Sequence, residues 1–110
     1  MIKQLLAVDG VMAVCRFRDD GAFVEGYGVM AESELAALAH FAHDYKRIVQ
    51  GNADQLSMFT GINGWTPPAG WIVRGTRMSV CSVANLVCTV ENADGNLSEV
   101  METLIEASHY

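Results

Sequence analysis

The chain has 110 residues, 51% of them hydrophobic, and a formal net charge of −6. This length fits a single domain, 1–110, and the apolar content is enough for a core without disulfide or metal staples. Seven lysines and arginines spread along an acidic chain disfavour nucleic acid or a membrane surface as partner, because both require clustered positive charge.

The N-terminus and the cysteines bear on the location of the protein. The first residues lack the apolar core and cleavage site of a signal peptide, and no apolar run approaches the roughly 20 residues of a membrane span. Three cysteines form an odd set, which suits a reducing compartment better than a disulfide framework. We therefore expect a soluble cytoplasmic protein.

The first thirty residues predict a short helix followed by a β-hairpin. An amphipathic segment from Ile2 to Val8 ends at Asp9-Gly10, where glycine breaks the helix. The hairpin strands run from Val11 to Arg18 and from Ala22 to Met30. They are joined by Asp19-Asp20-Gly21, a three-residue loop with glycine at its left-handed position.

Both faces of the first hairpin strand are partly apolar. Ala13, Cys15 and Phe17 alternate onto one face, and Met12 and Val14 onto the other. A strand with two apolar faces is typical of a sheet that helices cover on both sides.

A long helix follows, and its apolar face is wider than one sheet requires. Ser33 is the expected N-cap, with Glu34 in the first turn. Gly51-Asn52 is a candidate interruption, and Asn63-Gly64 is the stronger stop. The apolar residues at helical spacing are Leu35, Leu38, Ala42, Tyr45, Val49 and Leu56, flanked by Phe41, Ile48 and Phe59.

The second half of the chain predicts a loop, three strands and a helix. Residues 65–70 form the loop, because two consecutive prolines fix φ and remove two donors. Asn96 is the expected N-cap of the helix, with Glu99 as its capping-box partner. The strands are Trp71 to Arg74, Arg77 to Val83 and Leu86 to Asn92, with turns at Gly75-Thr76 and Ala84-Asn85. The expected buried stripe of the helix is Leu97, Val100 or Met101, Leu104 and Ile105.

This order of elements, α-β-β-α-β-β-β-α, predicts an α/β (α+β) sandwich in one domain. A five-stranded antiparallel sheet with helices on both faces satisfies all the patterns.

Cys81 and Cys88 are predicted to face each other across the last hairpin, because a two-residue turn at Ala84-Asn85 pairs them. The two residues would occupy a backbone-hydrogen-bonded position of the antiparallel pair, where Cβ atoms lie about 5.5 Å apart. A disulfide prefers a Cβ separation of about 3.8 Å. Core packing is the simplest interpretation, for Cys15 as well. A redox or persulfide site, or half a metal site, is the alternative for the pair.

Other residues capable of chemistry have simpler explanations. His40 and His43 share a face of the long helix, but no third ligand has metal-site spacing, so we interpret them as exposed or interface residues. Asp19 and Asp20 belong to a glycine turn, where aspartate is common. The chain has no nucleophile elbow, zincin helix or Cys-x-x-Cys motif. The sequence thus predicts no catalytic residue, no metal and no cofactor.

Two tryptophans near the proline loop are candidate recognition residues. Trp65, Pro67, Pro68 and Trp71 would make a rigid turn that presents indoles, and buried aromatics dominate binding hot spots. Alternatively, both indoles cap one end of the sandwich.

The whole order of elements resembles the roadblock/LC7 family, which is longin-like and broadly profilin-like. At residue level the resemblance rests on the apolar stretch from Leu5 to Val14, followed by Asp19-Asp20-Gly21 and the second strand. The proline loop and the cysteine-bearing hairpin are not general features of that family and look like those of a prokaryotic subfamily.

The resemblance implies a non-enzymatic homodimer that acts as a scaffold or regulatory protein. In the family, the third strand and long helix of one subunit meet their counterparts, and the resulting ten-stranded sheet docks small Ras-like GTPases or parts of larger complexes. The residues agree in one respect, because Trp71-Ile72-Val73 would be an apolar edge strand. The expected interface residues are Leu38, Phe41, Tyr45, Ile48, Trp65, Trp71, Ile72 and Val73.

The alternative function is a small-ligand or sulfur-carrier module that uses Cys81 and Cys88. The scaffold hypothesis requires two partners, a second copy of this chain and another protein. The carrier hypothesis requires reactive thiols.

Overall fold

The computed structural model describes the backbone of residues 2–60 and 70–108 and the side chains of 2–48 and 70–108. Its elements are η1 (Ile2–Ala7), β1 (Val11–Phe17), β2 (Phe23–Gly28), α1 (Glu32–Thr60), β3 (Gly70–Arg74), β4 (Met78–Val83), β5 (Leu86–Glu91) and α2 (Leu97–Ser108). The strands form one five-stranded antiparallel sheet, as predicted, and the structure shows that their order is β2-β1-β5-β4-β3.

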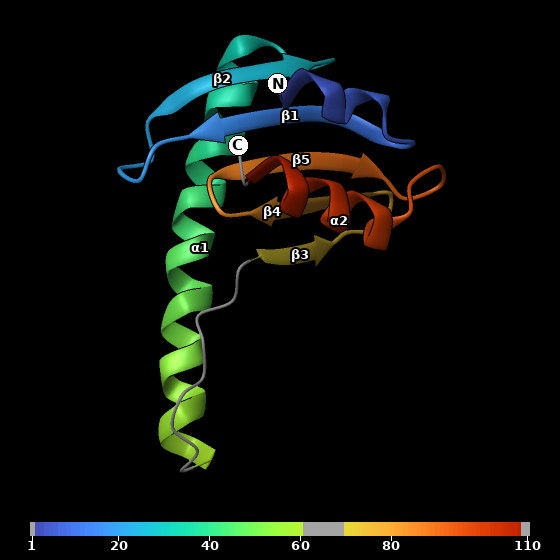
Figure 1. Cartoon of the computed structure of the whole chain (residues 1–110). Coiled ribbons are helices and arrows are strands. Elements are labelled where there is room, and N and C mark those ends of the chain that lie inside the picture. Colours follow the sequence, from blue (N-terminus) through green and yellow to red (C-terminus); the bar gives the residue numbers. More distant parts are fainter. Residues whose placement is uncertain (1, 61–69, 109–110) are drawn as a thin grey trace.

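Helices cover both faces of this sheet, so it has two hydrophobic cores. The 3-10 helix η1 and α2 pack on one face, and α1 packs on the other (Figure 1). The η1/α2 core contains Ile2, Leu5, Val14, Cys81, Val83, Leu86, Cys88, Val90, Val100 and Leu104. The α1 core contains Ala13, Cys15, Phe17, Leu35, Leu38, Ala39, Ala42, Trp71 and Val87. The predicted alternation of β1 between two apolar faces is confirmed.

The first hairpin follows the predicted turn, but its strands are shorter than expected. Arg18 N donates to Ala22 O at 2.8 Å, and Gly21 has a φ of 90°, so the three-residue loop with left-handed glycine is confirmed. Arg18 and Ala22 close this turn, so β1 ends at Phe17 and β2 begins at Phe23. Strand β2 ends at Gly28, where a φ of 131° departs from extended backbone. A Cβ there would lie 2.3 Å from Met12 O, which restricts the position to glycine.

The helices correct three expectations. The first helix is 3-10 rather than α, and α1 begins at Glu32. Ala31 N donates to Glu34 Oε1 at 3.2 Å, so Ser33 lies inside the first turn and is not the N-cap. Helix α1 continues through Gly51-Asn52 to Thr60, so the candidate interruption was wrong. The predicted stop at Asn63-Gly64 lies outside the described residues.

The C-terminal half follows the prediction closely. Each of the last three strands differs from its expected bounds by one residue. Glu99 N donates to Asn96 Oδ1 at 3.2 Å, which confirms the N-cap of α2. Val100 and Leu104 are fully buried, whereas Ile105 is 43% exposed and does not belong to the buried stripe.

Neither α-helix, in the part of the chain that the structure describes, combines the length and hydropathy needed to cross a bilayer.

Candidate functional site

Helix α1 crosses the sheet from the β2 side and then extends beyond β3 (Figure 1). Its first turns bury Leu35, Ala39 and Ala42 against the strands. On another side of the same stretch Phe41 is 43% exposed, and farther along the helix Ile48 is 58% exposed. Large apolar side chains that remain exposed in a group mark a surface suited to protein contact.

Three aromatic rings join this part of α1 to β3. The Tyr45 and Trp71 ring centroids are 4.7 Å apart, and Phe41 lies 5.7 Å from Tyr45 and 6.0 Å from Trp71. Trp71 is 9% exposed, and its buried Nε1 has no hydrogen-bond partner among the described residues. The indole therefore anchors α1 to the sheet beside the edge strand, and Phe41 forms the outer side of the cluster.

Strand β3 is an edge strand, and it pairs with β4 on one side. Gly75 N donates to Met78 O at 2.9 Å, so these residues form a hydrogen-bonded pair beside the turn. Such pairs alternate along antiparallel strands, so the backbone of Trp71 and Val73 bonds to β4. The backbone groups of Ile72 then point to the other edge of β3, which no strand of the described residues pairs with and which we call the open edge. The Ile72 side chain is 42% exposed.

The predicted interface residues fall into distinct environments. Phe41, Ile48 and Ile72 are exposed, and Tyr45 and Val73 are partly buried. Leu38 and Trp71 are each 9% exposed and pack in the core of their own chain, and their part in an interface stays a prediction. The prediction for Trp65 lies outside the described residues.

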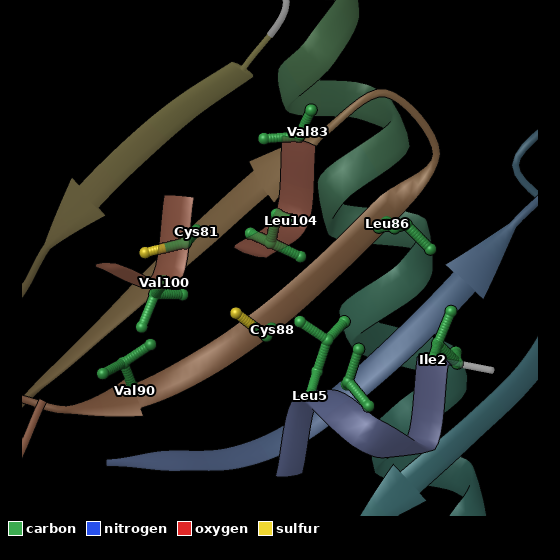
Figure 2. Close-up of a cluster of buried hydrophobic side chains, with 10 residues drawn as sticks. Ile2, Leu5, Cys81, Val83, Leu86, Cys88, Val90, Val100 and Leu104 are labelled. Carbon is green, nitrogen blue, oxygen red and sulfur yellow. The ribbon is translucent and has the colours of Figure 1, made fainter. Parts of the chain in front are cut away.

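Cys81 and Cys88 are directly opposite on β4 and β5, as predicted. Figure 2 shows both sulfurs among Val90 of β5, Val100 and Leu104 of α2, and the residues of η1. Both side chains are fully buried, and so is Cys15 on the other face of the sheet. All three thiols are free.

The thiols differ in their pKa values because of hydrogen bonding and burial. The neighbouring thiol of Cys88 lowers the pKa of Cys81, and the same thiol pairing, together with burial, raises the pKa of Cys88. Burial raises the pKa of Cys15 to about 11. A reactive cysteine needs both thiolate character and access, and these buried side chains have no access to solvent.

The two histidines of α1 have different environments. His40 is 72% exposed and lies 3.6 Å from Asp44. His43 is only 16% exposed, and its Nε2 donates to Asp19 O at 2.8 Å, so the expectation of an exposed side chain is wrong for His43. In residues 2–48 and 70–108, no group of three or more His, Cys, Asp or Glu side chains is placed to hold a metal ion.

A polar network at one end of the sheet was missed from the sequence. Lys46 Nζ donates to Asn85 Oδ1 at 3.0 Å, and Asn85 Nδ2 donates to Asp19 Oδ1 at 2.8 Å. Together with His43, these bonds tie α1 to the β1–β2 and β4–β5 turns. The three segments are far apart in the sequence and share no motif. The sequence therefore indicated the two turns but not the contact between them.

Comparison with known proteins identifies the family of this chain. The sequence matches over residues 1–106 the family described as "Uncharacterized conserved protein (DUF2173)", and no curated protein matches it.

Three solved structures illustrate the likeness. A Roadblock/LC7 domain from Streptomyces avermitilis has a TM-score of 0.79 at 9% identity, over 99% of this chain and 91% of that one. The gliding protein MglB from Thermus thermophilus has a TM-score of 0.76 at 17% identity, over 97% and 79%. An MglB with a tetrameric arrangement has a TM-score of 0.72 at 13% identity, over 96% and 77%. The chain therefore belongs to the uncharacterized conserved protein family DUF2173 and has the Roadblock/LC7 fold.

Proposed function

We propose that this protein is a non-enzymatic scaffold or regulatory subunit that acts as a homodimer and docks a partner protein. The observation that carries the proposal is the open edge of β3 beside the exposed apolar part of α1. An uncovered apolar edge strand pairs readily with another chain, and proteins that stay monomeric protect such edges with charges, prolines or covering segments.

In the proposed dimer, two copies of β3 pair across a two-fold axis and extend the sheet to ten strands. A two-fold interface brings the same residues of both subunits together. The exposed Phe41 and Ile48 then lie near the second copy of α1, and Ile72 lies at the strand pair. An MglB with a tetrameric arrangement has the same fold, which supports self-association.

The test is the mass of the protein in solution at micromolar concentration, measured by light scattering. We expect twice the monomer mass of 11.9 kDa for the natural sequence. Phe41→Glu should weaken the dimer by at least about thirtyfold, because it places a charge in a desolvated apolar contact. Ile105→Glu is the matched control, since Ile105 is equally exposed but lies on α2. A natural protein that stays monomeric would remove the basis of the proposal.

The partner class that we propose is a small Ras-like GTPase, as the Roadblock/LC7 resemblance implies. We expect the dimer to bind such a GTPase from its own organism with a different affinity for the GTP-bound and GDP-bound forms. Binding measured by calorimetry with both nucleotide states tests this. Equal affinity for both states would point to a passive scaffold, and no binding to any such GTPase would contradict the partner class.

The alternative, a sulfur-carrier or redox module at Cys81 and Cys88, requires access to the thiols. The neighbouring thiol of Cys88 lowers the pKa of Cys81, which favours a thiolate there, but the side chain is fully buried. Thiol labelling of the native protein distinguishes the two functions, because a carrier would be labelled before it unfolds. A cytoplasmic location remains a prediction under either function.

A further inference from the structure

A cavity of about 350 Å³ lies at the end of the sheet where the β1–β2 and β4–β5 turns meet. Its walls come from these turns, from Lys46 of α1 and from the last turn of α2 at Ala107 and Ser108. A groove of about 300 Å³ between η1 and α2 adjoins it, because Arg16 and Ala107 line both spaces. The size lies within the range of small-molecule sites in proteins.

Arg16 is the residue of this cavity that the fold leaves unexplained. It lies near the end of β1, on the same face as the fully buried Val14, and its Nε is buried without a hydrogen-bond partner. Glu25 is its neighbour in register on β2, yet no carboxylate of the described residues lies within ion-pair distance of Arg16. Buried polar groups are nearly always bonded, so an unpaired guanidinium nitrogen in a cavity indicates a missing acceptor.

Among the described residues that line the cavity, the cations outnumber the carboxylates. Lys46 adds a second cation, held in place by its bond to Asn85 Oδ1. The carboxylate is that of Asp19, whose Oδ1 already accepts from Asn85. A second carboxylate, that of Glu106, lines the adjoining groove rather than the cavity itself.

We propose that this cavity binds a small molecule that carries an oxyanion, either a phosphate or a carboxylate group. The Arg16 guanidinium supplies the planar donors that oxyanions accept, and the Lys46 ammonium supplies a second charge. The proposal does not rest on the homodimer, because none of the residues that line the cavity is among the expected interface residues. The bound molecule would link both turns, α1 and α2, and would stabilise their arrangement.

The experiment is a titration with inorganic phosphate, repeated with acetate, at constant ionic strength set by chloride. The Nε–Hε resonance of Arg16 in ¹H–¹⁵N spectra reports directly on the unpaired nitrogen. We expect a saturable shift of that resonance in the millimolar range, larger than any shift at Arg18. Tighter binding of phosphate than of acetate assigns a phosphorylated ligand, and the reverse order assigns a carboxylate.

Matched variants separate this site from general charge attraction. Arg16→Gln should weaken phosphate binding at least about tenfold, since a charge-assisted hydrogen bond is lost. Arg18→Gln removes the same charge two residues away, where the side chain is 69% exposed, and should change the affinity less than about twofold. A second pair of variants leaves β1 unaltered. Lys46→Gln should weaken phosphate binding, and Arg47→Gln, at an exposed position outside the cavity lining, should not.

Two results would overturn the proposal. One is the absence of a saturable shift at Arg16 with either anion in the natural protein, which would mean that water alone satisfies Nε. The other is an equal loss of affinity in Arg16→Gln and Arg18→Gln, because the attraction would then come from the surface charge of the chain.

Discussion

The two faces of the sheet differ in how completely the chain covers them. On the η1/α2 face, two helices enclose ten buried residues, including Cys81 and Cys88 (Figure 2). On the α1 face, one helix crosses the strands and continues past β3, leaving Phe41 and Ile48 exposed (Figure 1). Both faces contribute buried apolar side chains to the stability of the single chain. The α1 face also has apolar surface left over for another protein.

The largest effect is expected from truncation in the closed core. Leu104→Ala removes a fully buried side chain that packs between α2 and the sheet, and it should lower the free energy of unfolding by about 2–5 kcal/mol. Ile105→Ala, one residue later and 43% exposed, should cost less than about 1 kcal/mol. Urea denaturation measures both. Similar costs at the two positions would mean that the η1/α2 face is not the tightly packed one.

Proline at adjacent positions of β3 distinguishes its two edges. Val73→Pro removes a donor that bonds to β4 and should destabilise the chain by about 1–3 kcal/mol. Ile72→Pro removes a donor that points to the open edge, so the chain should fold while its self-association weakens. Denaturation and light scattering report the two effects. If Ile72→Pro unfolds the chain and leaves the dimer unaffected, the assigned direction of these backbone groups is wrong.

A smaller effect concerns alkaline pH and the α1 core. Burial raises the pKa of Cys15 from 9.0 to about 11, so the folded chain keeps a proton that the unfolded chain loses. This contribution to stability is fully present below pH 9 and is lost as the pH rises toward 11, by about 2 kcal/mol. Cys88, whose pKa is also raised, acts in the same direction.

Cys15→Ala isolates the contribution of Cys15. The decrease in the free energy of unfolding between pH 9 and pH 11 should be about 2 kcal/mol smaller in Cys15→Ala than in the natural protein. Denaturation curves across that range provide the measurement. An unchanged decrease would show that Cys15 reaches solvent in the folded state.

The elements that could be predicted are those whose signals are local. Asp19-Asp20-Gly21 and Ala84-Asn85 are turns that their own residues determine, and the second turn sets the pairing of Cys81 with Cys88. The start of α1 was less clear, because Ser33 and Glu34 both suit a first turn. The Glu34 side chain settled it by accepting from Ala31 N. A difference of one hydrogen bond is too small for a sequence pattern to resolve.

The candidate surfaces could be predicted only in part. The apolar spacing of α1 pointed to Phe41 and Ile48, which are exposed, and also to Leu38, which is buried in the core of the same chain. Helical periodicity identifies a wide apolar face, and it does not say which part the strands occupy. The cavity at Arg16 had no sequence signal, because its lining residues come from four separate elements and two turns.

The sequence by itself determined the order of elements, the alternation of β1 and the turn that pairs the cysteines, because these depend on residues close together in the chain. Only the tertiary structure decided which apolar side chains remain exposed. It also decided that His43, Lys46, Asn85 and Asp19 meet at one end of the sheet. The reason is physical, since burial and long-range hydrogen bonds depend on where a helix crosses a sheet, and a few degrees of crossing angle change both.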